Sequence, residues 1–191
     1  ETIFKEAGFG DSSSEVSVIV GAAKLAATLV SVRFVDRLGR RPLLFAGIGM
    51  MLVALLLLTI GFQLASGTSS ADVVLADGWP PVVVGSLMVY VCGYQIGFGP
   101  ISWLLISEVF PIKSRTRALS LAVIINFGFN LLATFALSPL QEALDDLSPG
   151  KGTSYLFAAY AVMCVVSILF VHQFVPETKG KSLEEIEEML R

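Results

Sequence analysis

PLLFAGIGMMLVALLLLTIGFQLA, residues 42–65, contains no charged side chain. A helix needs about 20 mostly apolar residues to cross a bilayer, so this stretch predicts a transmembrane helix. The rest of the chain has the same character: of its 191 residues, 54% are hydrophobic and only 15% are charged. Soluble proteins seldom have this composition, and we therefore expect an integral membrane protein.

Four further stretches are long and apolar enough to span a membrane. Each of the five is followed by a charged, polar or proline-containing segment that would end a helix. The predicted fold class is all-α, a polytopic transmembrane helical bundle, with spans at about residues 16–35, 42–65, 81–107, 118–140 and 154–175.

The flanking segments are predicted to lie outside the membrane. Residues 1–15 are interpreted as a non-cytoplasmic loop or the end of a preceding helix. Residues 176–191 are expected to form a cytoplasmic tail. In this tail Ser182 and Glu185 have the spacing of a capping box, which predicts a short amphipathic helix.

Positive charge supports this number of spans. Five spans place ten of the 13 Lys and Arg residues on one side, two on the other, and Lys24 within the first span. Loops on the cytoplasmic side of a membrane are enriched in Lys and Arg. We therefore assign the basic side to the cytoplasm. Dropping one span would reverse the side of every later loop.

Several classes of function find no support in the sequence. The net charge is −3, and no basic stripe interleaved with aromatic residues indicates nucleic-acid binding. Cys92 and Cys164 lack the spacing of metal ligands, and the single histidine, His172, is interpreted as structural. No constellation of nucleophile, base or paired carboxylates occurs in the spans. We expect no enzymatic activity, no metal and no cofactor.

The third span contains a helix break, YQIGFGPISW at residues 94–103. Inside a membrane, broken helices persist where protein or a water-filled cavity surrounds them. Such a break favours a substrate pathway, with Tyr94, Gln95 and Trp103 supplying a phenol, an amide and an indole. A neutral polyol needs flat apolar faces and a few hydrogen-bonding groups. The alternative is a kink that serves helix packing, with Trp103 as filler.

Polar side chains also occur within two other spans. Asn126 and Asn130 share one helix face, and each could bind a ligand hydroxyl or a neighbouring helix. We favour ligand contact for Asn126 and helix contact for Asn130. Lys24 lies near the membrane midplane, where a charge costs about 2.5–3.5 kcal/mol. We expect it to face a cavity; snorkelling or pairing with an acid is the alternative.

Charges gather where two of the spans end. DRLGRR at 36–41 and the segment from Glu108 to Arg117 place acids beside arginines at equivalent depth. Such charges could hold helix ends together in one state of a transporter and release them in another. The alternative is that they only fix the orientation of the loops.

Taken together, these motifs resemble the sugar porter family of the major facilitator superfamily. Their order and spacing match it over nearly the whole chain: DRLGRR at 36–41, GPISW at 99–103, EVFP at 108–111 and PETKG at 176–180. The chain is most similar to plant-type vacuolar and plastid glucose or D-xylose–proton symporter-like transporters. The resemblance implies the last five helices of a twelve-helix fold, with an N-terminal half outside this chain.

The resemblance also implies roles for individual residues. Trp103 would pack against the sugar ring and Asn126 would bind a hydroxyl. The remaining substrate-binding candidates are Tyr94, Gln95, Lys24 and Gly99, the last because a glycine lets a ligand approach the backbone. An inner-gate charge network would comprise Asp36, Arg40, Arg41, Glu108 and Arg115. Gln95 and Lys24 depart from the family pattern.

The expected function is transport of a monosaccharide, glucose or a xylose-like sugar, by alternating access. Transport is expected to run either downhill or coupled to protons. The expected partners are the sugar, the lipid bilayer, protons in the coupled case and the missing N-terminal half. A transporter-like sugar sensor, which binds without transporting, is the alternative. The sequence leaves open whether the membrane is vacuolar, plastid or plasma.

Overall fold

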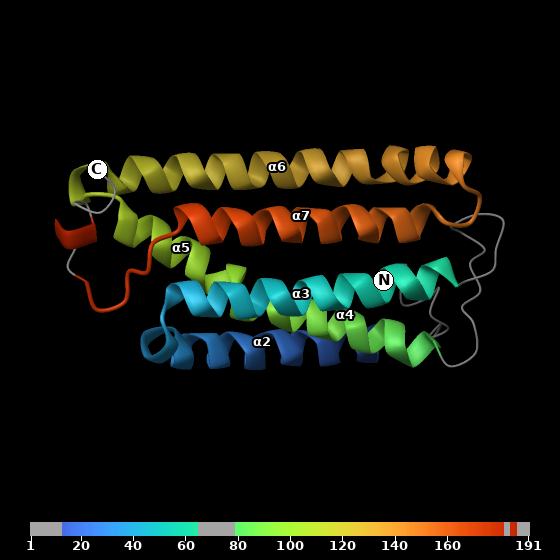
Figure 1. Cartoon of the computed structure of the whole chain (residues 1–191), viewed down its shortest axis with the longest axis horizontal. Coiled ribbons are helices and arrows are strands. Elements are labelled where there is room, and N and C mark those ends of the chain that lie inside the picture. The colour runs from blue at the N-terminus through green and yellow to red at the C-terminus, as the bar shows by residue number, and fades with distance from the viewer. Residues whose placement is uncertain (1–12, 65–78, 182–183, 187–191) are drawn as a thin grey trace.

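The computed structural model describes residues 13–64, 79–181 and 184–186. These residues form six long helices packed side by side, with no strand among the described residues (Figure 1). The helices are α2 (Ser13–Leu38), α3 (Arg40–Gln63), α4 (Trp79–Ile96), α5 (Phe98–Val109), α6 (Ile112–Leu147) and α7 (Gly152–Phe174). The predicted all-α class is confirmed.

Four stretches of the described chain are long and apolar enough to cross a membrane. They are Arg40–Gln63, Trp79–Val109, Ser114–Leu147 and Gly152–Phe174. Each contains or closely overlaps one of the predicted spans. The predicted first span, 16–35, lies within α2, which is not among these four stretches. Most of the predicted tail helix lies outside the described residues; residues 184–186 are helical and Ile186 is buried.

The membrane stretch Trp79–Val109 is broken where the sequence predicted. α4 ends at Ile96 and α5 begins at Phe98, with Gly97 between them at φ −89° and ψ −84°. Pro100 therefore lies in the first turn of α5. At that position the missing N–H is one of the first four of α5, which have no acceptor within that helix; the carbonyl four residues earlier, that of Ile96, belongs to α4. The break lets α5 run obliquely from α4 toward the start of α6 (Figure 1).

α3 is the central helix of the bundle. One cluster of buried side chains joins Leu58 and Phe62 of α3 to Val83 of α4 and Phe157 of α7. A second joins Ile48 of α3 to helices α5 and α7. Lipid is as apolar as these side chains, so dispersion and close packing hold the helices together here.

Three glycines allow α3 to touch the broken helix. A Cβ atom on Gly47 would lie 2.6 Å from the Gly93 carbonyl oxygen and 2.6 Å from the Gly97 Cα. In the other direction, a Cβ on Gly93 would lie 2.8 Å from the Gly47 carbonyl oxygen. Real Cβ atoms do not approach backbone this closely, so the two backbones meet directly at the break.

α6 is long and sparsely packed. Its 36 residues extend about 54 Å, beyond the roughly 30 Å of hydrocarbon in a bilayer. It continues past the predicted end at residue 140. The turn into α7 is tied by a hydrogen bond from the Gly152 N–H to Asp145 Oδ1, 2.8 Å. None of the membrane window of α6 is buried within this chain.

Replacing Gly47 with alanine tests the contact at the break. The new methyl group collides with backbone, so the free energy of unfolding should fall by about 1–3 kcal/mol. Gly49→Ala is the matched control, because a Cβ there meets nothing within 4 Å. Its stability should stay unchanged or rise by about 0.5–1 kcal/mol, as for Gly to Ala in a helix. Thermal unfolding of the detergent-purified protein measures both; equal effects would contradict the contact.

Candidate functional site

A hollow of about 450 Å³ lies beside the helix break. Its walls come from α4, α5 and α6, and its lining residues are Tyr94, Phe98, Ser102, Trp103, Ile106, Ala122 and Asn126. The volume falls within the range of small-molecule pockets. No lining side chain carries a charge at neutral pH.

The break brings two aromatic side chains to this hollow. Tyr94 precedes it on α4 and Trp103 follows it on α5. Both rings remain accessible, with 46% of Tyr94 and 39% of Trp103 exposed. The Tyr94 ring also lies 6.5 Å from the Phe98 ring, centroid to centroid. The hollow thus presents flat apolar surfaces that no described residue covers.

Hydrogen-bonding groups lie among these rings. Four of the lining residues carry a hydrogen-bonding side chain: Tyr94 and Ser102 a hydroxyl, Trp103 an indole N–H and Asn126 an amide. The Asn126 amide has no hydrogen bond to another described residue. An aromatic wall with uncharged donors and acceptors suits a neutral, hydroxylated ligand.

The structure brings together three of the six predicted substrate-binding residues: Tyr94, Trp103 and Asn126. Gln95 turns away from them, and its amide Nε2 donates to Thr28 Oγ1 at 2.9 Å. Gly99 is not among the lining residues, and a Cβ there would be 3.3 Å from Gln95 Oε1. Lys24 is exposed on α2 and is not among the lining residues.

Asn130 is exposed on α6, one turn beyond Asn126. Its side chain makes no hydrogen bond to a described residue, so the predicted contact with another helix is not formed within this part of the chain. Its carbonyl accepts a hydrogen bond from Thr134 of the same helix.

The other four lining residues were not predicted from the sequence to belong to a site. Phe98, Ser102 and Ile106 recur every four residues, so they share the face of α5 that borders the hollow. This spacing was present in the sequence. Ala122 gave no signal, because a small apolar residue is common on any membrane helix.

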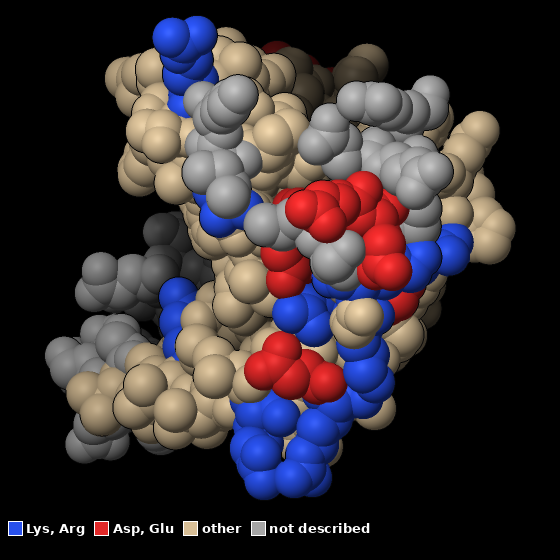
Figure 2. All heavy atoms as spheres, turned by 90° about the vertical axis from the view of Figure 1, so that its left-hand side faces the viewer, with Lys and Arg blue, Asp and Glu red and all other residues tan. Residues whose placement is uncertain are grey.

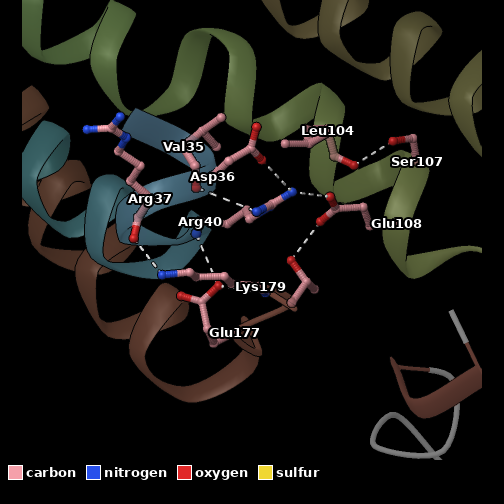
Figure 3. Close-up of polar contacts among 10 residues, drawn as sticks. Val35, Asp36, Arg37, Arg40, Leu104, Ser107, Glu108, Glu177 and Lys179 are labelled. Carbon is pink, nitrogen blue, oxygen red and sulfur yellow. Dashed lines mark hydrogen bonds and ion pairs between the residues drawn. The ribbon is translucent and has the colours of Figure 1, made fainter. Parts of the chain in front are cut away.

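A cluster of charges lies at one end of the bundle, the end predicted to face the cytoplasm. Figure 2 looks onto this end and shows acidic and basic side chains interleaved there. At its centre Arg40 Nη2 donates to Glu108 Oε1 at 2.9 Å. Both side chains are largely buried, at 13% and 18% exposed. The Thr178 hydroxyl donates to the other Glu108 oxygen at 2.6 Å. The cluster therefore joins α3, α5 and the segment after α7 (Figure 3).

Glu177 caps the start of α3. Its two carboxylate oxygens accept hydrogen bonds from the N–H groups of Arg40 and Arg41, each at 3.1 Å. A carboxylate at this helix end accepts hydrogen bonds from N–H groups that have no partner within the helix. Its negative charge also interacts favourably with the positive end of the helix dipole. Gly39 permits the contact: its φ is 100°, and a Cβ there would lie 2.7 Å from Glu177 Oε2. Sequence analysis recognised the motif around Glu177 but did not predict this cap.

The other predicted gate residues have smaller parts in the cluster. Asp36 lies 3.4 Å from Arg40 Nη2, but its carboxylate side chain is 78% exposed. Arg41 donates to the carbonyl of His172, whose ring faces Phe45. Arg115 pairs with no acid among the described residues, and its Nε is buried without a partner there. Of the five predicted gate residues, Arg40 and Glu108 form the largely buried pair at the centre of this cluster.

The chain matches known proteins both in sequence and in structure. Residues 1–190 match the family described as sugar (and other) transporter. "D-xylose-proton symporter-like 1" of Arabidopsis thaliana is 45% identical over 97% of this chain and 34% of its own length. The "Facilitated trehalose transporter Tret1" of Bombyx mori is 40% identical over 97% and 34%. The chain therefore spans about a third of the curated relatives that it matches.

A solved structure has the same arrangement of helices. It is that of the major facilitator superfamily proton:xylose symporter XylE bound to 6-bromo-6-deoxy-D-glucose. The TM-score is 0.75 and the identity 32%, over 95% of this chain and 35% of that one. The chain has the fold of part of a major facilitator and is an integral, multi-pass membrane protein.

Removing the carboxylate of Glu177 tests the cap. Glu177→Ala should cost about 1–2 kcal/mol of stability, the usual cost of losing a helix cap. The backbone amides of Arg40 and Arg41 should then exchange with deuterium faster than in the wild type. Glu142→Ala removes an exposed acid of α6 and serves as the control. Unchanged exchange at both amides in Glu177→Ala would contradict the capping role.

Proposed function

This chain belongs to the sugar (and other) transporter family, and from that premise we propose that it helps to move a monosaccharide across a membrane. It would do so as the C-terminal part of a longer protein. The relatives it matches are about three times its length, and in this chain one side of the hollow is uncovered. The exposed face of α6 supports the same arrangement, because it offers Asn126 to the part of the protein outside this chain.

The observation that carries this proposal is the position of Trp103, Tyr94 and Asn126 around one uncharged hollow. The break at Gly97 lies within the membrane stretch Trp79–Val109, some distance from either end. Substrate sites of transporters lie near the midplane, at interrupted helices. The rings would cover the C–H faces of a sugar, and the amide and hydroxyl groups would bind its hydroxyls.

The charge cluster would close the cytoplasmic side of the pathway. Arg40, Glu108 and Thr178 connect helices that must separate or approach as the protein alternates between its two open states. A charge-assisted hydrogen bond between largely buried partners is stronger than a surface ion pair. Breaking the bond between Arg40 and Glu108 at the cytoplasmic end would favour the state open to the cytoplasm.

The proposal also covers catalysis, the sensor alternative, the sugar with its coupling to protons, and two candidate residues away from the hollow. Transport makes and breaks no covalent bond, so the protein is proposed not to be an enzyme and to need no cofactor. The relatives are named as transporters, which gives the sensor alternative no support. Their names include a D-xylose-proton symporter-like protein and a trehalose transporter; for this chain we propose a monosaccharide, moved either downhill or together with protons. Lys24 and Gln95 do not line the hollow, so their proposed contact with the sugar depends on the part of the protein outside this chain.

Trp103→Ala tests the sugar site. In proteoliposomes of the full-length protein, uptake of D-glucose or D-xylose should fall at least about tenfold, because the indole supplies the main apolar contact. Phe135→Ala is the control: Phe135 is 74% exposed on α6 and does not line the hollow. Its uptake should stay near the wild-type rate. Wild-type uptake by Trp103→Ala would contradict the site, and sugar binding without uptake by the wild type would favour a sensor.

The two acids beside Arg40 provide a paired test of the gate. Glu108→Gln removes the buried partner at 2.9 Å, whereas Asp36→Asn removes the exposed partner at 3.4 Å. Thiol-reagent labelling of cysteines placed in the cytoplasmic pathway should rise several-fold more in Glu108→Gln than in Asp36→Asn. Exposed ion pairs contribute little, which is the reason for the difference. Equal labelling in the two variants would count against the gate.

A further inference from the structure

Pro100 leaves one carbonyl of the broken helix without its normal partner. In a continuous helix the Ile96 carbonyl would accept a hydrogen bond from the N–H of residue 100. Proline has no N–H, so this bond cannot form. The carbonyl lies in a membrane stretch, where an unsatisfied backbone group costs several kcal/mol.

Ser31 of α2 supplies the missing donor. Its hydroxyl donates to the Ile96 carbonyl at 2.9 Å, across 65 positions of sequence. The Ser31 side chain is fully buried, with 0% exposed. A serine in a helix usually bonds a carbonyl of its own helix, as Ser86 does to Val82 at 2.7 Å. Ser31 instead reaches the neighbouring helix at the residue that Pro100 leaves unsatisfied.

A second hydrogen bond lies beside it. Thr28, one turn before Ser31 on α2, accepts a hydrogen bond from the Gln95 amide at 2.9 Å. Two consecutive residues at the end of α4 are thus held by one face of α2. On another side Gly47 of α3 touches Gly97. The break is therefore fixed between two helices.

We propose that Ser31 is a positioning residue for the sugar site: by satisfying the Ile96 carbonyl, it fixes the angle at which α5 leaves α4. Tyr94 lies before the break and Trp103 after it, so this angle sets the separation of the two aromatic walls. Ser31 does not line the hollow and acts only through the backbone. This role rests on the proposed function of the hollow.

The test compares two buried serines in the full-length protein. Ser31→Ala should weaken binding of D-glucose or D-xylose about tenfold, raising Kd and KM more than it lowers the maximal rate. Ser86→Ala, which removes a buried hydroxyl bonded within its own helix, should change Kd less than about twofold. Both variants should be present in membranes at similar amounts. An unchanged Kd in Ser31→Ala, or equal losses in the two variants, would overturn the proposal.

Pro100→Ala adds a test of the mechanism itself. It restores an N–H four residues after Ile96, so the hydroxyl of Ser31 becomes redundant. In the Pro100→Ala background, Ser31→Ala should change Kd and melting temperature much less than in the wild type. Equal effects in both backgrounds would show that Ser31 does not replace the lost donor. The melting-temperature comparison also applies if Ser31→Ala is recovered in low yield.

These outcomes separate the inference from the proposed function. If Trp103→Ala binds sugar normally, the hollow is not the sugar site and the substrate role of Ser31 is lost with it. If Trp103→Ala loses binding but Ser31→Ala does not, the site stands and the positioning role fails.

Discussion

The missing N–H of Pro100 is the constraint around which this bundle is arranged. A bilayer offers no water to satisfy the Ile96 carbonyl, so another part of the protein must do so. The hydroxyl of Ser31 does this from one side, while Gly47 approaches the bare backbone of Gly97 from another. The interruption that weakens the helix thus becomes a fixed bend, and that bend places Tyr94 and Trp103 on the two sides of one hollow.

α5 connects the two ends of the proposed mechanism. One of its faces borders the hollow through Ser102, Trp103 and Ile106, and Glu108 near its end bonds Arg40 and Thr178. The helix has 12 residues and is about 18 Å long. A rigid element of this length cannot tilt at the hollow without moving Glu108. A change in the sugar site and a change in the charge cluster are therefore mechanically related.

The fold was more predictable than the site. Runs of apolar residues, a proline that follows two glycines and the distribution of Lys and Arg are local signals, and they were enough to locate the helices and the break. Gln95 does not line the hollow in this chain, and its position could not be predicted because sequence spacing does not say which neighbour a side chain meets; here that neighbour is Thr28 of α2. The cap by Glu177 was missed for the same reason, since its partners Arg40 and Arg41 are far away in the sequence. Lys24 and Asn130 face outward from the described residues, so their partners stay predictions.

The distance between Glu177 and α3 has a consequence for biosynthesis. The two partners are 137 positions apart, so the first turn of α3 leaves the ribosome well before its cap has been translated. At about 5–20 residues per second, that interval lasts roughly 7–27 s. During this interval the N–H groups at the start of α3 lack the Glu177 carboxylate as their acceptor. The cap can form only after α7 has inserted, so its formation reports that α7 has reached its place.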